Sequence, residues 1–210
     1  MLFHVDLSPG IQTHVSTLEC LLALRSTCKR ATLAIVFKPT VAKTLLDEHG
    51  KSLLCFHAVS IGDLSLLQFA VRRGCMTHLV CDDAAEAGHL HILKWAHEHG
   101  YPWNEYTCSY AARNGHLECL TYAHEHGCPW DEMTCAKAAS GGQLECLAYA
   151  HEHGCLWDEK TCSYAAFFGQ LECLTYAHEH GCPWDEDTCS YAARNDHLVC
   201  LAYAREHGCP

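Results

Sequence analysis

From Trp103 onward the sequence repeats itself at intervals of 27 residues. The stretch WNEYTCSYAARNGHLECLTYAHEHGCP returns, with few changes, from Trp130, Trp157 and Trp184. Self-similarity at a fixed period of about 20 to 50 residues is typical of stacked repeat arrays, because each unit is one supersecondary motif that buries its apolar side only against its neighbours. The sequence therefore predicts an elongated array of near-identical units.

Each unit is expected to begin with a short helix. Thr107 is the predicted N-cap, because a threonine hydroxyl accepts a hydrogen bond from an unpaired N–H of the first helical turn. The helix then runs through Ala111 and Ala112 to a turn at Asn114-Gly115. Gly115 is expected to take the positive φ that such a corner requires.

A second short helix follows the corner. Its apolar residues recur at helical spacing and predict a buried stripe, formed by Leu117, Leu120 and Ala123. Gly127 is the expected left-handed cap at its end, and Pro129 prevents the helix from continuing. The unit is thus predicted to be a helix-turn-helix.

The run TCSYAARNGHLECLTYAHEHG resembles the ankyrin repeat, whose usual pattern is T-P-L-H-x-A-A-x-x-G-H-L-E-x-V, followed by a leucine-rich helix that ends in E-x-G. The resemblance implies an all-α fold, an α-solenoid of stacked helix-turn-helix repeats. The unit is shorter than the usual length of about 33 residues. Since the shortening lies between units, we expect the long β-turn finger of ordinary ankyrin repeats to be missing. This short form, with its HEHGCPWDE joint, is similar to ankyrin-like arrays of giant amoeba-infecting DNA viruses.

The array is expected to occupy residues 39–210. Its predicted units are about 52–75, 76–102, 103–129, 130–156, 157–183 and 184–210. Divergence in the first two units is typical of a cap, and the segment TVAKTLLDEHG looks like a stray second helix that ends at Gly50. At the other end we expect an uncovered apolar flank on Leu198, Leu201 and Ala204, which favours either self-association or a truncated gene.

Residues 1–38 lie outside the repeat pattern. The segment Leu7-Ser8-Pro9-Gly10-Ile11, then Val15, then LLALRSTCKR resembles an F-box, although Gly10 replaces the usual glutamate and Ala31 stands where tryptophan is common. The resemblance implies contact with a Skp-type adaptor of a cullin-based ubiquitin ligase. The residues expected to make this contact are Leu7, Ile11, Val15, Leu21, Leu22 and Leu24. The alternative is that this segment only caps the first repeat.

Charge and composition narrow the choice of partner and compartment. The formal net charge is −11, and such an acidic array repels phosphate backbones, so a basic or neutral protein partner is expected and nucleic acid is not. No apolar run approaches the roughly 20 residues of a spanning helix, and the first residues lack a signal-peptide pattern. The protein is expected to be intracellular, in the host cytoplasm or nucleus. The 17 cysteines follow the repeat period and are interpreted as small buried hydrophobes with free thiols.

The motif His124-Glu125-His126-Gly127-Cys128 raises the question of a metal site, because histidine and cysteine four residues apart on a helix can share a metal ion. The alternative is a packed, hydrogen-bonded column of histidines, which we prefer. We therefore expect no metal and no cofactor. A catalytic site is not expected either, because every Cys-His pair is copied several times and a nucleophile requires a unique pocket.

The positions that vary between units are the best candidates for binding a partner. Before each threonine, in a predicted loop, the equivalent residues are Tyr106, Met133, Lys160 and Asp187. In the first helix Tyr110 becomes Lys137, and the pair Arg113-Asn114 becomes Phe167 and Phe168. The two phenylalanines are the first candidates for an interface hot spot. The alternative is that they pack against a neighbouring unit.

Overall fold

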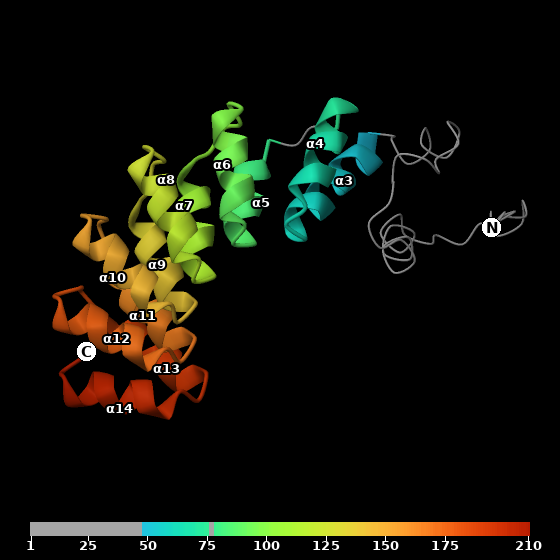
Figure 1. The fold of residues 1–210 in the computed structure, drawn as a ribbon. Helices are drawn as coiled ribbons and strands as arrows, with labels where there is room; N and C mark the ends of the chain where they lie inside the picture. The colour runs from blue at the N-terminus through green and yellow to red at the C-terminus, as the bar shows by residue number, and fades with distance from the viewer. Residues whose placement is uncertain (1–47, 76–77) are drawn as a thin grey trace, which may run out of the picture.

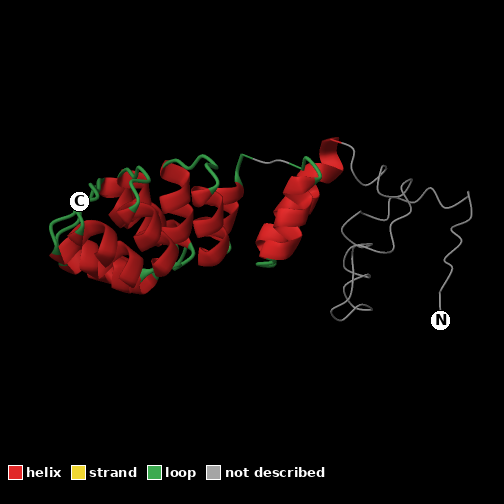
Figure 2. Ribbon diagram, turned by 45° about the horizontal axis from the view of Figure 1, so that its top comes forward, coloured by secondary structure: helices red, strands yellow, loops and turns green. Residues whose placement is uncertain are grey.

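The computed structural model describes residues 48–75 and 78–210 as a stack of short helices (Figure 1). These residues form twelve helices and no strand, joined by short loops (Figure 2). Consecutive helices pair as two antiparallel arms of one unit, and the pairs follow one another from α3 to α14. The predicted fold class, an all-α solenoid of helix-turn-helix repeats, is confirmed.

Two rows of helices make up the stack. The first helices of the units are α3 (Glu48–Ser60), α5 (Val80–Glu86), α7 (Glu105–Arg113), α9 (Glu132–Ser140), α11 (Glu159–Phe167) and α13 (Glu186–Arg194). The second helices are α4 (Leu64–Arg72), α6 (Leu90–Glu98), α8 (Leu117–Glu125), α10 (Leu144–Glu152), α12 (Leu171–Glu179) and α14 (Leu198–Glu206). Each first helix contacts the first helices of its neighbours, and from α6 onward the second helices do the same.

The first helices begin earlier than predicted. The N-cap of α7 is Asn104, whose side-chain oxygen accepts from the backbone N–H of Tyr106 at 2.9 Å. Aspartate takes this place in the next three units, at Asp131, Asp158 and Asp185. Thr107 is instead the third residue of α7, and its hydroxyl accepts from the backbone N–H of Asn104 to complete a capping box. The prediction of Thr107 as the N-cap is therefore wrong, because the Asx side chain three residues earlier takes that role.

The predicted corners and helix ends are confirmed. Gly115 has a φ of 76° and Gly127 a φ of 81°, both in the left-handed region. At Gly115 there is a second constraint, because a Cβ atom would collide with the side-chain amide of Gln143 from the next unit. The β-turn finger is missing, as expected, since only the six residues between Glu125 and Glu132 connect α8 to α9.

The core consists largely of small side chains. Cys108, Ala111 and Ala112 of α7 are fully buried, and Leu120 and Ala123 of α8 complete the interior of the same unit. Small residues at the interface let neighbouring helices pack closely at native density. All cysteines in the described residues are free, which agrees with the interpretation of cysteine as a small hydrophobe.

Burial keeps the core thiols protonated. It raises the pKa of the Cys119 thiol to about 11 and that of Cys173 to about 12, each with a smaller contribution from a neighbouring glutamate. Cys128 also donates a hydrogen bond from Sγ to the carbonyl of Asn104, at 3.2 Å. The thiolate is the reactive form of cysteine, so these protonated thiols are expected to react slowly.

Both ends of the array depart in part from expectation. The helix predicted to end at Gly50 does not end there: α3 starts at Glu48 and continues to Ser60, because no proline follows Gly50. Leu198 is 67% exposed and Leu201 is half-buried, as predicted, but Ala204 is buried. Packing of α14 on α13 is enough to cover so short a side chain.

The F-box-like segment, residues 1–38, lies outside the described residues.

No helix within residues 48–75 and 78–210 is long and apolar enough to cross a membrane.

Candidate interaction surface

The first helices α5 to α13 expose one continuous face of the stack. In α7 this face is formed by Tyr106, Tyr110 and Arg113, while Cys108 and Ala111 point into the core. The equivalent positions are exposed or half-buried in the other units, except at Ser140 of α9, which is buried. The nearly constant buried residues therefore keep the helices in the same position in every unit, while the residues at the outward positions vary. We call this surface the first-helix face.

The four variable residues predicted before the threonines lie on this face. Each is the second residue of its helix and not part of a loop, because the helices start at the preceding glutamate. The loop assignment was wrong for the same reason as the threonine cap. In order along the row they are Tyr106, which is 53% exposed, Met133, which is half-buried, and Lys160 and Asp187, which are exposed.

Lys160 is the one member of this row with an ion-pair partner. Its ammonium lies 3.2 Å from Asp158, the N-cap of its own helix, and this is the only salt bridge within the described residues. The hydrogen bond and charge of Asp158 raise the pKa of Lys160. An exposed pair of this kind contributes little to stability.

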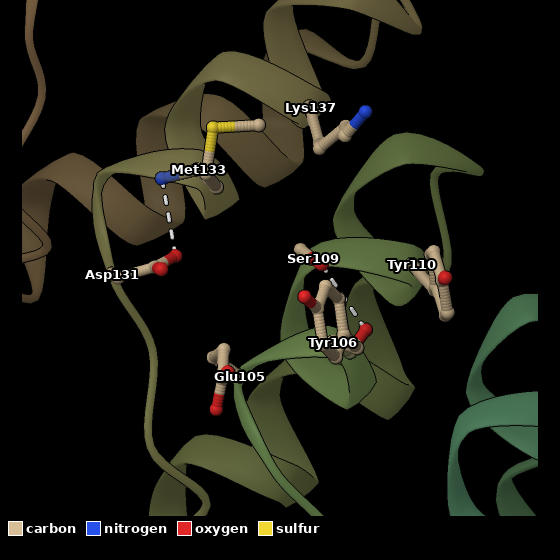
Figure 3. Close-up of a pocket in the computed structure, with 7 residues that line it drawn as sticks. All are labelled: Glu105, Tyr106, Ser109, Tyr110, Asp131, Met133 and Lys137. Carbon is tan, nitrogen blue, oxygen red and sulfur yellow. Dashed lines mark hydrogen bonds between the residues drawn. The ribbon is translucent and has the colours of Figure 1, made fainter. Parts of the chain in front are cut away.

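A shallow hollow of about 190 Å³ lies between α7 and α9 on the first-helix face (Figure 3). It contains three of the predicted binding residues, Tyr106, Met133 and Lys137. Its complete lining is Glu105, Tyr106, Ser109, Tyr110, Asp131, Met133 and Lys137. The rings of Tyr106 and Tyr110 stack with their centroids 5.9 Å apart, so the α7 side of the hollow is aromatic.

Phe167 and Phe168 form a second feature of this face, at the end of α11. Their rings meet edge to face at 4.8 Å, and Phe167 also meets Tyr191 of the next unit at 5.5 Å. They remain 36% and 46% exposed. The pair is thus partly packed against a neighbouring unit and partly open to solvent. A role in binding a partner stays a prediction.

The histidines occupy the opposite, second-helix side of the stack. His124 stacks on Trp130, with ring centroids 3.8 Å apart, and its Nδ1 lies 3.1 Å from the hydroxyl of Tyr149 in the next unit. The arrangement is repeated around His97, His151 and His178. This agrees with the predicted column of packed, hydrogen-bonded histidines.

The partners of the histidine column were missed in the sequence. Histidine recurs six residues before each tryptophan and 25 residues before each tyrosine, and this double spacing was the available signal. Among the described residues no group of three or more His, Cys, Asp or Glu side chains has the geometry to hold a metal ion.

Buried surroundings also change the acidity of two of these rings. Desolvation lowers the pKa of His124, and the nearby ring of His153 lowers it further, while Glu125 acts in the opposite direction. His151 has a lowered pKa for the same reasons, with His180 and Glu152 as the neighbours. Both shifts favour the neutral form of the imidazole.

Comparison with known proteins identifies the repeat. The family model for ankyrin repeats (many copies) matches residues 81–124. The sequence has no match among curated proteins. Among solved structures, the ankyrin repeat domain of human ASB11 superposes with a TM-score of 0.59 at 17% identity, over 74% of this chain and 84% of that chain. At 17% identity this similarity shows a shared fold only. Residues 81–124 thus match the ankyrin repeat model, and the described part of the chain has the fold of an ankyrin repeat domain.

Proposed function

We propose that the protein is a non-catalytic scaffold that binds another protein through its first-helix face. One observation carries the proposal: a nearly constant interior presents outward side chains that change from unit to unit, and several of these are aromatic. Tyrosine and other aromatic residues dominate the energetics of protein interfaces. Repeat arrays use such extended faces for binding.

The test uses residues that the repeat itself supplies. The double variant Phe167→Arg with Phe168→Asn gives α11 the pair found at Arg113-Asn114, so the fold is expected to persist. Binding partners captured from a host lysate by the native chain should be lost. Leu156→Pro is the control, since Leu156 is a 77% exposed apolar residue in the loop before α11 and proline occupies the same place in other units. If both variants capture the same proteins as the native chain, the two phenylalanines do not contribute to binding.

A substrate-receptor role is the finer form of this proposal. The F-box-like segment would engage a Skp-type adaptor through Leu7, Ile11, Val15, Leu21, Leu22 and Leu24, and the array would present a target to the ligase. The similarity to short viral arrays, together with free cysteines throughout the described residues, favours the reducing cytoplasm of an infected host.

A pull-down with the Skp-type adaptor of an amoebal host tests this role. The native chain should bind, and a variant with Leu21, Leu22 and Leu24 changed to serine should not, while its helical circular-dichroism signal stays the same. If the native chain does not bind, residues 1–38 act as a cap and the scaffold works without the ligase.

Self-association through α14 is a second candidate. Leu198 and Val199 are 67% and 64% exposed, and glutamate takes the place of Val199 in the three preceding units. Val199→Glu should therefore shift the protein toward monomer in light-scattering measurements. A native chain that is monomeric at all concentrations would refute this candidate.

A further inference from the structure

The hollow between α7 and α9 carries unbalanced negative charge. Two carboxylates line it, those of Glu105 and Asp131, against one ammonium, that of Lys137. Glu105 and Asp131 lie on one side of the hollow and Lys137 on the other (Figure 3). Within the described part of the chain no basic side chain pairs with either carboxylate, since the salt bridge there joins Lys160 to Asp158.

Asp131 is held in place by its role as the cap of α9. One of its oxygens accepts the backbone N–H of Met133 at 3.1 Å, which fixes the carboxylate at the edge of the hollow. A carboxylate that is already oriented loses less side-chain entropy when it binds a ligand. The second oxygen has no hydrogen-bond partner among the described residues.

The aromatic wall favours a cation as well. The Tyr106 ring is more than half exposed and stacks with Tyr110 along α7. The faces of such rings carry negative potential and attract a guanidinium or ammonium placed over them. A planar guanidinium also forms paired hydrogen bonds to a carboxylate, whereas an ammonium acts as a point charge.

We propose that this hollow binds an arginine side chain from a basic segment of the partner protein. The proposal rests on the first-helix face being the binding surface. The guanidinium would lie over Tyr106 and donate to Glu105 and to the free oxygen of Asp131. The surroundings fit a basic segment, because the next first helices also begin with glutamate, at Glu132, Glu159 and Glu186, and the net charge of the chain is −11.

Lys137 limits the hollow to a single cation. Its position is tyrosine in the other three perfect repeats, at Tyr110, Tyr164 and Tyr191. Its ammonium stands across the hollow from the carboxylates and repels a second positive side chain. Lys137→Gln should therefore tighten binding of an arginine-rich peptide.

The test measures binding of a fluorescein-labelled arginine nonapeptide by anisotropy at physiological ionic strength. Glu105→Gln with Asp131→Asn removes both charges, and the asparagine keeps the helix cap, as Asn104 does in α7. Binding should weaken about tenfold, since hydrogen bonds to charged groups are lost. Tyr106→Leu should weaken it about threefold through loss of the cation–π contact.

The matched control is Asp185→Asn with Glu186→Gln, at the N-cap and first residue of α13. It changes the net charge by the same amount at the same two repeat positions, outside the hollow. Binding by this variant should stay within about twofold of the native chain, because distant surface charges are largely screened. Equal losses in both double variants, or equal binding of a citrulline nonapeptide, would overturn the proposal.

Failure here is distinguishable from failure of the scaffold proposal. If the peptide does not discriminate the variants but Phe167→Arg with Phe168→Asn loses the captured partner, the face binds proteins and the hollow is not an arginine site. If no first-helix variant changes partner capture, the face itself is not the binding surface.

Discussion

At the scale of single residues, Asp196 departs most clearly from the pattern of the array. It has a φ of 59°, and no other non-glycine residue in the described part of the chain has a positive φ. Glycine holds the equivalent corner in the three preceding units, at Gly115, Gly142 and Gly169. In those units the His or Gln side chain of the next unit also occupies the space that a Cβ atom would need. The left-handed region costs an L-residue about 1 kcal/mol, less for Asp than for most.

Asp196→Gly should therefore raise the free energy of unfolding by about 0.5 kcal/mol, measured by urea denaturation. The reverse change, Gly169→Asp, should be far more costly, because it adds the same backbone strain and displaces the ring of His197, whose Nδ1 lies 2.5 Å from the Cβ position. Equal and opposite effects would mean that only φ matters at these corners.

At the scale of helices, most of the unit could be predicted from the sequence, and its start could not. The corners and second helices were correct because glycine and proline act locally and the apolar period is strong. Both Thr107 and Asn104 are good N-caps, one turn apart, so local propensity does not decide between them. Packing decides: the threonine is drawn into the interior, where Thr134, Thr161 and Thr188 are fully buried.

The two possible caps of α11 give opposite expectations. Asp158→Ala should lower the free energy of unfolding by about 1 kcal/mol through loss of the cap, and Asp158→Asn should change it little. Thr161→Val should be neutral or stabilising, because the hydroxyl of Thr161 is buried without a hydrogen-bond partner. Thr107→Val serves as the contrast, since the hydroxyl of Thr107 donates to Asp82 and its loss should destabilise. A loss of stability in Thr161→Val as large as that in Asp158→Ala would restore threonine as the cap.

At the scale of the whole molecule, the two rows of helices have separate roles. The first helices carry the variable surface, and the second helices carry the column of stacked histidine, tryptophan and tyrosine that links each unit to the next. Sequence variation pointed to Tyr106, Met133 and Lys137, and the structure brings these three into one hollow. The sequence did not indicate that Glu105 and Asp131 also line the hollow. Among the four perfect repeats, glutamate recurs at the first position in every unit and aspartate at the second in all but one, so both were read as structural residues of the repeat.

The column should make the stability of the array depend on pH. The pKa values of His124 and His151 lie below the ordinary 6.5 in the folded chain, so above that pH both states are neutral and stability is complete. As pH falls below 6.5 the unfolded chain takes up protons first, and the free energy of unfolding decreases. Asp83 acts in the opposite direction, because burial and the charges of Asp82 and Glu86 raise its pKa to about 6, so its protonation favours the folded state as pH falls.

Urea denaturation at pH 7.5 and 5.5, in the native chain and in His124→Gln with His151→Gln, separates the two effects. The native chain should lose more stability than the double variant over this interval, and an identical loss in both would show that protonation of the column does not control folding.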